Sequence, residues 1–539
     1  MLDKMSSNQR LILAVVLSFV FFVGYTTAFP PKQVETDGNI TVKTALDQAS
    51  AEGFTPTVTQ PETGHQVHTD ERVVKNSTNT LVAIESDHFS IKIDTLGRIA
   101  SKILKDEKYN SDGQPSEMIP STGAKPMYIR FADDTLNKEA STVAYTTDIQ
   151  SAAVDQDTAV KVVLTQQLSS LTVRKELTFY ADGHYDVMIN LSEDKRYFVY
   201  LGQHVEHKGT MMMAIHGAMV YAGDDLTTIF EDGDVEGRST FNDVYLTSAF
   251  DQYFASLFYN LKPDDTVMVE RDRDDNPIVY IGGLQSMTFS GYIGPKDYRI
   301  LQSIDPVLVN AIEYGWFTFA SAPLFKVLMW LESIFGNWGW AIVALTALIR
   351  MLLYPLTYKG MVSMQKMKEL APKMKELKEK YKGDPQRLNA ATMEMYKKNG
   401  ANPLGGCLPL LLQIPVFFAI YRVLLNAVEL QGAEWILWIN DLSRMDPYFI
   451  LPILMGATMF YQQHITPNNF TDPLQEKVFK FLPLIFTFFF VTFPAGLVLY
   501  WLINNLFQIA QQSIVNKTFE AAKAMRHEKH LAEKHHGKD

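Results

Sequence analysis

The chain has 539 residues, of which 47% are hydrophobic and 20% charged, with a formal net charge of −11 and a mean hydropathy of −0.05. Such averages describe a soluble acidic protein, but the residues are unevenly distributed. Residues 30–308 hold 24 Lys and Arg against 42 Asp and Glu, whereas residues 338–514 contain several apolar runs. These runs, of about 17–25 residues, are long enough to cross roughly 30 Å of hydrocarbon. With Cys407 as the only cysteine, the composition excludes a simple soluble enzyme, a disulfide scaffold and a nucleic-acid binder that acts through bulk positive charge.

The first apolar run lies at the N-terminus. Lys4 and Arg10 precede residues 11–29, which are apolar or small throughout. A signal-peptide core usually has only about 7–15 residues, so we expect residues 1–29 to be an uncleaved transmembrane anchor whose N-terminus is cytoplasmic. The alternative is a cleaved signal peptide, because Thr26-Thr27-Ala28 loosely resembles a cleavage site. Both alternatives export the segment that follows.

An exported region of two kinds follows the anchor. Residues 30–80 are rich in Thr, Gln, Glu, Asp and Pro, which predicts a flexible linker because little apolar surface can be buried. Residues 81–307 instead alternate apolar and polar positions, as in Phe89, Ile91 and Ile93, with turns rich in Gly and Asp between the runs. Many short alternating runs predict antiparallel sheets. We therefore expect a large all-β sandwich at residues 81–307.

Histidines and acidic clusters are the only candidate ligands in the predicted sandwich. His204, His207 and His216 lie close together in the sequence, but no cysteine is near, and Glu206 would face away from its neighbouring histidines on a strand. Exposed or core-satisfied histidines are therefore favoured over a metal site. The acidic clusters lack the regular spacing and closing Glu of a calcium loop. We expect no catalysis, no metal and no cofactor here.

Residues 308–337 are transitional between the sandwich and the apolar runs. Aromatic residues, among them Tyr314, Trp316 and Phe319, occur with Lys326 and Glu332 in this segment. The pattern predicts an amphipathic helix in the membrane interface, with its rings at headgroup depth. An additional spanning helix is the alternative.

Five further spans are expected, which gives six with the anchor. They are placed at residues 338–357, 404–428, 447–464, 478–493 and 495–514. Residues 358–403 hold 11 Lys and Arg against 5 Asp and Glu, whereas residues 429–446 are acidic. Because positive loops stay in the cytoplasm, residues 358–403 are predicted to be cytoplasmic and the acidic loop to lie outside. Six spans then return the basic tail, residues 515–539, to the cytoplasm.

The cytoplasmic insert is predicted to be a helical hairpin. Its methionines recur at three- and four-residue steps, with a break at Gly383-Asp384-Pro385; those of the first half are Met361, Met364, Met367 and Met374. A methionine stripe usually forms a contact between helices. Methionine is also adaptable enough to meet many apolar sequences, so contact with hydrophobic clients is a second interpretation.

Arg350 is the most informative residue of the predicted spans. It lies in the otherwise uncharged run 341–356, where an isolated arginine costs on the order of 3 kcal/mol. A snorkelling side chain is one interpretation. Other spans also carry polar residues, namely Gln413, Asn504, Asn505 and Gln508, and Thr346 is one turn before Arg350. Because no Asp or Glu lies in any predicted span, a hydrated cavity is favoured over a sealed bundle.

Four segments of the helical region resemble a known family. They are NPLGGCLPLLLQIPVFFAIY (402–421), LTALIRMLLYPLT (345–357), DPYFILPILMG (446–456) and FPAGLVLYW (493–501). These motifs, in this order, are similar to those of the YidC/Oxa family of membrane protein insertases. The large exported sandwich resembles the type found in Gram-negative bacteria.

The resemblance implies an α-helical polytopic membrane protein whose five-helix core encloses a positively charged groove, with a β-supersandwich-like periplasmic domain. Arg350 would be the groove cation, and Thr346, Gln413, Asn504 and Gln508 would line the groove. The apolar and aromatic residues expected to contact a client are Phe417, Met455, Phe489, Tyr500 and Trp501. Trp501 stands where many relatives have Tyr.

The resemblance also implies a function and partners. The protein would be an insertase and folding chaperone of the inner membrane, acting alone or with the Sec translocon. Its expected partners are nascent membrane proteins, the phospholipid bilayer and the ribosome, the last through the hairpin and tail, and it is expected to be monomeric. No enzymatic activity and no cofactor are expected.

Two other classes of protein fit the sequence less well. A transporter should show an internal repeat with broken helices in corresponding halves, and we find no such symmetry. An intramembrane enzyme needs a nucleophile with a base, paired carboxylates or a metal motif, whereas the spans offer only His464 at an edge. No nucleotide-binding loop is present in the sequence, so we expect no ATP hydrolysis.

Overall fold

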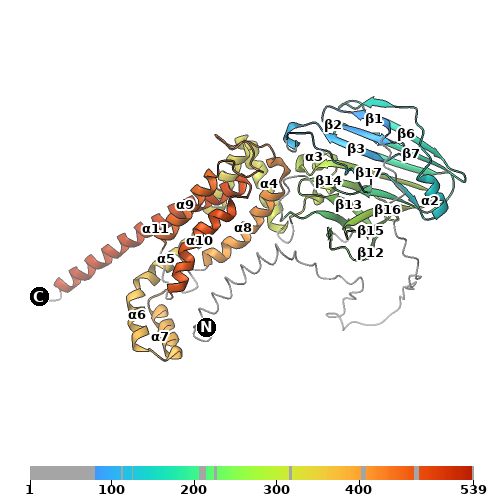
Figure 1. Ribbon diagram of the computed structural model, residues 1–539. Helices are drawn as coiled ribbons and strands as arrows, with labels where there is room; N and C mark the ends of the chain where they lie inside the picture. The colour runs from blue at the N-terminus through green and yellow to red at the C-terminus, as the bar shows by residue number, and fades with distance from the viewer. Residues whose placement is uncertain are drawn as a thin grey trace. The chain divides into compact units, whose positions relative to one another are not determined.

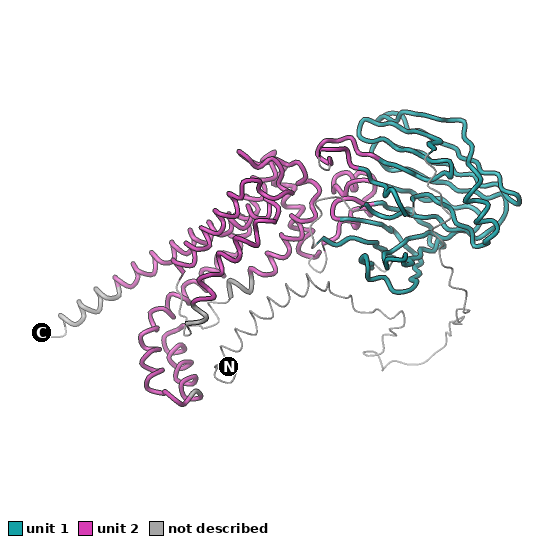
Figure 2. The backbone as a smooth tube through the Cα atoms, in the orientation of Figure 1, with its two compact units in different colours: residues 1–102, 117–251, 256–293 teal, residues 103–116, 252–255, 294–539 magenta. Residues whose placement is uncertain are grey.

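A computed structural model describes residues 79–536 except 111–112, 124, 206–213, 224–226, 315–317, 402–407 and 467–472. The predicted anchor and nearly all of the predicted linker lie outside the described residues. The chain forms two compact units (Figure 2). Unit 1 comprises residues 1–102, 117–251 and 256–293, and unit 2 comprises residues 103–116, 252–255 and 294–539.

Unit 1 is built from three β-sheets, which Figure 1 shows as stacked layers. The four-stranded sheet has the order β3-β2-β1-β5, with β1 Thr80–Glu85, β2 Phe89–Asp94, β3 Ile99–Leu104 and β5 Ser151–Ala153. The eight-stranded sheet has the order β11-β10-β13-β14-β17-β8-β7-β6, with β6 Val160–Gln167, β7 Thr172–Phe179, β8 His184–Leu191, β10 Gly217–Ala222, β11 Thr227–Glu231, β13 Val244–Phe250, β14 Phe254–Tyr259 and β17 Ser286–Pro295. The five-stranded sheet has the order β12-β15-β16-β9-β4, with β4 Ile129–Phe131, β9 Tyr197–Gly202, β12 Arg238–Phe241, β15 Thr266–Arg271 and β16 Pro277–Gly283.

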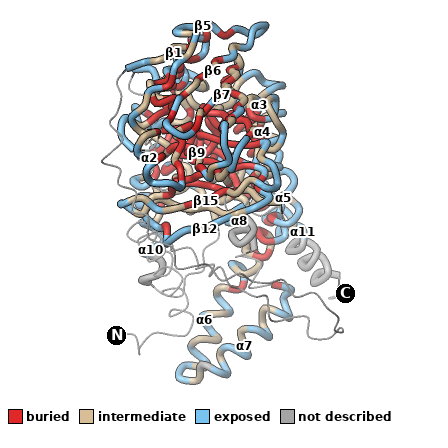
Figure 3. Tube along the Cα trace, turned by 90° about the vertical axis from the view of Figure 1, so that its right-hand side faces the viewer, coloured by how far each residue is buried: buried red, intermediate tan, exposed pale blue. Residues whose placement is uncertain are grey.

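Alternating side chains explain how these strands form. In β8, Tyr185, Val187, Ile189 and Leu191 are all buried, and the residues between them are not. Because successive side chains of a strand point to opposite faces, one face of β8 enters the core. Buried positions accordingly concentrate between the sheets in Figure 3. The prediction of a large β-rich domain is confirmed; this unit also carries one short helix, α2 (Asp134–Ala140).

Unit 2 is mainly helical. Its α-helices are α3 Tyr298–Ile304, α4 Thr318–Phe335, α5 Trp338–Glu369, α6 Ala371–Lys380, α7 Pro385–Lys398, α8 Leu408–Asn426, α9 Ile450–Ile465, α10 Pro473–Phe490 and α11 Ala495–His536. Short 3-10 helices occur at η3 Glu107–Tyr109, η4 Pro306–Ala311 and η7 Val428–Leu430. The helix α11 packs against both α5 and α9, and α4 packs against α5 and α8. The predicted combination of a β-rich region with C-terminal helices is thus confirmed.

Two helices extend beyond the spans expected from the apolar runs. The helix α5 continues from the apolar run through the first quarter of the charged insert to Glu369, with Pro355 inside it. Most of residues 358–369 favour a helix, because Lys, Met, Gln and Glu are good helix formers and the single glycine, Gly360, costs only about 1 kcal/mol. A new helix begins only at α6, which has a proline in its first turn. In the same way α11 joins the last apolar run to the basic tail.

Some of the helices among the described residues have the length and composition of membrane spans. Two helices, α4 and α5, are long and apolar enough to cross a membrane, and α8 contains a shorter apolar helix at residues 413–426. The six-span arrangement therefore remains a prediction. The sequence predicted that this region would form a helix in the membrane interface, with a spanning helix as the alternative. The length and composition of α4 fit a spanning helix.

Candidate functional site

The guanidinium of Arg350 lies between two helices of unit 2. Arg350 is on α5 and only 4% exposed. Its Nε donates a hydrogen bond to Oδ1 of Asn504 at 2.7 Å, and its Nη2 donates to Oε1 of Gln508 at 2.9 Å. Asn504 and Gln508 are four residues apart on α11, so they share one face of that helix. Two amide oxygens thus hold the guanidinium in a fixed orientation.

Other predicted polar residues surround this pair of contacts. The amide of Gln413, on α8, donates to the hydroxyl of Tyr500 at 3.2 Å and approaches Oδ1 of Asn504 at 3.5 Å. Thr346 is buried, but its hydroxyl donates to the backbone oxygen of Ile342, one turn earlier on α5. The structure therefore brings Gln413 into the network of Arg350, whereas the hydroxyl of Thr346 is used within its own helix.

No carboxylate pairs with Arg350 in the part of the chain that the structure describes; its side-chain partners there are neutral amides. A second buried arginine shows the contrast. Arg98 of unit 1, at 1% exposure, has its Nη2 2.7 Å from a carboxylate oxygen of Asp94, which is equally buried. A guanidinium stays protonated in proteins. Arg350 therefore presents a positive charge that the described residues do not neutralise.

The helix α11 carries more buried amide side chains than the sequence analysis assigned to the groove. Gln511 donates to the backbone oxygen of Arg350 at 3.3 Å, and Asn505 donates to the hydroxyl of Thr458, on α9, at 3.3 Å. Gln511, Asn505 and Gln512 are all buried. The helical spacing of residues 504, 508 and 511 could have revealed this face from the sequence, because residues three and four apart are neighbours on a helix.

The outward faces of these helices are apolar, the reverse of a soluble bundle. Exposed apolar side chains occur on α5, α9 and α10: Leu348, Met351, Leu352, Ile453, Leu454, Phe460, Phe481, Leu484, Ile485 and Phe488. Arg350 on α5 and Asn504, Asn505 and Gln511 on α11 are buried, and Gln508 is half-buried. An apolar exterior around a polar interior suits a lipid environment, because contiguous exposed apolar surface is rare on soluble monomers.

The residues predicted to contact a client fall into two groups. Trp501 packs edge-on against Phe417, with ring centroids 4.7 Å apart, and Phe489 is 42% exposed. By contrast, Met455 is fully buried and Tyr500 is 2% exposed. In this conformation Met455 and Tyr500 are therefore part of the helix packing. Their contact with a client stays a prediction that requires the helices to separate.

The methionines of the predicted hairpin are not equally accessible. Met361 lies on α5 and is buried, while Met364, Met367 and Met374 are half-buried. The sulfur of Met374, on α6, accepts a hydrogen bond from Thr392 of α7 at 3.6 Å. Met374 thus serves as a contact between helices, as the first interpretation expected. Contact of this stripe with clients remains a prediction.

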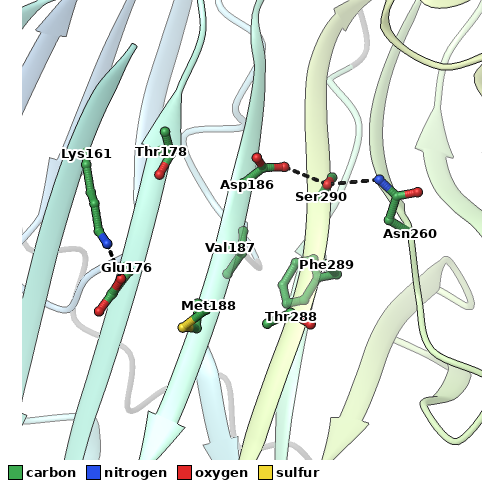
Figure 4. A pocket seen from close by; sticks show the side chains of 10 residues that line it. All are labelled: Lys161, Glu176, Thr178, Asp186, Val187, Met188, Asn260, Thr288, Phe289 and Ser290. Atoms are coloured by element: carbon green, nitrogen blue, oxygen red, sulfur yellow. Dashed lines mark hydrogen bonds and ion pairs between the residues drawn. The ribbon is translucent and has the colours of Figure 1, made fainter.

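A shallow pocket on unit 1 is a weaker candidate. It lies over β6, β7, β8 and β17, and Figure 4 shows the side chains that line it. Its polar groups already bind one another: Ser290 donates to Asp186 at 2.7 Å, Asn260 donates to Ser290 at 3.2 Å, and Lys161 pairs with Glu176. We assign no ligand to it.

Comparisons with known proteins agree with the division into two parts. The family model described as 60Kd inner membrane protein matches residues 330–523, and that described as YidC periplasmic domain matches residues 81–327. A membrane protein insertase YidC of Wolinella succinogenes is 47% identical over 524 residues, which is 97% of this chain and 97% of the relative. The corresponding protein of Campylobacter jejuni is 46% identical, covering 96% and 97%.

Among solved structures, a crystal structure of an active YidC insertase with its first transmembrane domain resolved covers 81% of this chain and 94% of its own. Its identity of 19% and TM-score of 0.36 are too low to carry an argument. The family models and the close relatives define the class of protein, an inner membrane protein with a periplasmic domain. The chain belongs to the YidC family of membrane protein insertases.

Proposed function

We propose that this protein is a membrane protein insertase and folding chaperone that moves nascent hydrophobic segments from the cytoplasm into the inner membrane. The route is a hydrated, positively charged groove around Arg350, used alone or together with the Sec translocon. The observation that carries the proposal is the buried guanidinium, held by Asn504 and Gln508 and left without a carboxylate among the described residues.

The charge of Arg350 supplies the first step. A nascent segment with an acidic outer end is attracted toward the guanidinium, because opposite charges are screened less in a narrow groove inside the membrane than in bulk water. The amides of Asn504 and Gln508 fix the direction of the N–H groups before a client arrives, so no reorganisation is needed. The client thus supplies the missing counter-charge temporarily.

Hydration and lipid supply the later steps. Unsatisfied backbone groups in hydrocarbon cost several kcal/mol each, so a polar groove lowers the barrier for the outer end of the client. The apolar segment then moves along Phe417, Phe489 and Trp501 into lipid, driven by its own transfer free energy. The methionine-bearing hairpin is the proposed first contact in the cytoplasm, where the ribosome would also bind weakly.

The test replaces Arg350 and measures insertion of a single-span client in vesicles. Arg350→Ala is expected to reduce insertion of a client with an acidic outer end several-fold. Arg350→Lys keeps the charge but loses the two-point contact with Asn504 and Gln508, so an intermediate result is expected. Arg422→Ala is the matched control, because it removes a half-buried arginine from α8 near that helix's C-terminal end.

Clients with acidic and neutral outer ends should be compared in the same assay. The effect of Arg350→Ala is expected to be largest for the acidic client and small for the neutral one. Equal insertion of the acidic client by the parent and both Arg350 variants would refute capture by charge. A loss as large with Arg422→Ala would show that any helix charge suffices.

A further inference from the structure

Three polar side chains from separate segments of unit 1 converge on one carboxylate oxygen. His204 follows β9, His216 directly precedes β10, and Asp232 directly follows β11. Nε2 of His204 lies 3.1 Å from Oδ2 of Asp232, and Nδ1 of His216 lies 2.8 Å from the same oxygen. One potential ligand atom from each residue lies within 4.8 Å of the other two.

The sheet register explains why these residues meet. The strands β10 and β11 form an antiparallel pair in which Gly217 is opposite Glu231. His216 and Asp232 are the next residues outward, and the backbone N–H of Asp232 donates to the oxygen of His216 at 3.2 Å. His204 comes from the end of β9, which belongs to the five-stranded sheet, whereas β10 and β11 belong to the eight-stranded sheet. The cluster therefore joins two sheets.

The three side chains of the cluster differ in exposure, and one carboxylate oxygen of Asp232 has no hydrogen-bond partner among the described residues. The side chains of His204 and Asp232 are each 12% exposed, and that of His216 is 36% exposed. Oδ1 of Asp232 is buried without a hydrogen-bond partner among the described residues.

We propose that His204, His216 and Asp232 bind a late first-row divalent transition-metal ion, for which Zn²⁺ is the probe. Two imidazole nitrogens and one carboxylate oxygen are a ligand set that Zn²⁺ accepts, with water in the fourth position. Ligand atoms around tetrahedral Zn²⁺ are about 3.3 Å apart, as follows from bond lengths of about 2.0–2.1 Å. Small outward movements of the two imidazoles would therefore admit the ion. Ca²⁺ and Mg²⁺ fit poorly because they prefer oxygen ligands.

The bound ion would tie the end of β9 to the β10–β11 hairpin, where β11 is the edge strand of its sheet. Cys407 is the only cysteine of the chain and lies outside unit 1, so no disulfide within that unit can make this link. A metal link at an edge strand resists separation of the two sheets. This role is independent of the proposed insertase function.

The test uses the full chain in detergent, stripped of metal, with the four histidines of the tail replaced by Gln because they could bind metal themselves: His527, His530, His535 and His536. Zn²⁺ is titrated against a chromogenic chelator. We expect one ion per chain, and at least tenfold weaker binding for His216→Gln and for Asp232→Asn. Co²⁺ bound in place of Zn²⁺ should give the intense visible absorption of a four-coordinate site, and both variants should lose it.

The matched control is His184→Gln. His184 also contacts an aspartate, Asp182, but that pair belongs to no group of three potential ligands among the described residues. This variant should bind Zn²⁺ like the parent. His216→Gln keeps the test valid if Asp232→Asn misfolds, because His216 is the most exposed of the three. Absence of stoichiometric binding, or equal binding by the parent and His216→Gln, would overturn the proposal and leave a hydrogen-bonded His–Asp–His cluster.

Discussion

At the scale of single residues, the two amide acceptors determine how much positive charge Arg350 presents. Asn504 and Gln508 orient the guanidinium but carry no net charge. Arg98 shows what a carboxylate does in the same chain, because Asp94 pairs with its guanidinium and neutralises the charge. A single substitution can give Arg350 a carboxylate partner like that of Arg98.

Asn504→Asp makes this conversion. The new carboxylate would take the place of the amide that accepts from Nε of Arg350, so it should neutralise the cation while leaving the side chain in place. Insertion of an acidic client is expected to fall several-fold, toward the level of Arg350→Ala, in the vesicle assay. Asn504→Ser, which adds no charge, should have the smaller effect. Parental activity of Asn504→Asp with the acidic client would contradict the electrostatic argument.

Glu429 is a half-buried acid outside the helical spans and gives unit 2 a pH dependence. Its carboxylate accepts from the backbone N–H of Tyr298 at 2.8 Å. Burial, and then the neighbouring charge of Asp297, raise the pKa of Glu429 from 4.5 to about 7. As the pH rises from 4.5 to about 7, the unfolded state releases a proton that the folded state retains. The free energy of unfolding therefore falls through this window and is constant above it.

Glu429→Gln should remove this dependence. The neutral amide can still accept from Tyr298, so at pH 8 the variant should be more stable than the parent by at most about 3 kcal/mol, and near pH 4.5 the two should be alike. Thermal unfolding in detergent at pH 4.5, 6 and 8 measures the difference. Glu434→Gln, an exposed position in the same loop, is the control. Parallel curves for the parent and Glu429→Gln would show that Glu429 is not the source.

At the scale of secondary-structure elements, the alternation in the sequence located strands well, whereas apolar runs located helix ends poorly. The predicted residues of β2 and β8 are strands with the expected buried faces. The apolar run that ends near residue 357 does not end α5, which continues to Glu369. An apolar run indicates which part of a helix contacts lipid. Where the helix ends depends instead on capping residues and prolines, which lie in polar sequence.

A close approach of α9 and α10 depends on Gly456. A Cβ at this position would collide with the side chain of Thr487, on α10. Gly456→Val is expected to destabilise the helical unit by about 1–3 kcal/mol, because the helices must move apart. Thermal unfolding in detergent measures it, and adding Thr487→Ala should recover part of the loss. Ala457→Val, at an exposed position, is the matched control. Equal effects of the two valine substitutions would refute the packing argument.

At the scale of the whole molecule, the uneven charge predicts how the chain lies across the membrane. The acidic residues 30–308 and the basic residues 358–403 are expected on opposite sides. Family membership supports an inner membrane protein with a periplasmic domain. The number of spans and the orientation of the termini remain predictions.

Cysteine labelling tests this orientation. In a Cys407→Ser background, Asp274→Cys and Lys378→Cys place single thiols on an exposed turn of unit 1 and on α6. A membrane-impermeant maleimide applied to spheroplasts should label position 274, and it should label position 378 only after the membrane is permeabilised. Labelling of position 378 in intact spheroplasts would refute the cytoplasmic hairpin.

The sequence alone determined what depends on local pattern and on solvent. Period-two alternation indicated the β-rich unit, apolar runs indicated the helices, and the isolation of Arg350 in its run indicated a polar interior. Gln413 and Asn504 could be named as residues of the same polar interior from the sequence, because polar residues in apolar helices tend to face the interior.

Only the tertiary structure decided which of these residues meet. Asn504 is 154 residues from Arg350, and the packing of α5 against α11 selects it as a partner. Packing also buries Met455 and Tyr500. Strand register brings His216 to Asp232, and the course of the chain after β9 brings His204 to the same carboxylate. Such contacts depend on long-range packing and register, which local periodicity does not encode. From the sequence, His204 and His216 were weighed as metal ligands and not favoured, because Asp232, the carboxylate that the fold brings to them, is distant in the chain.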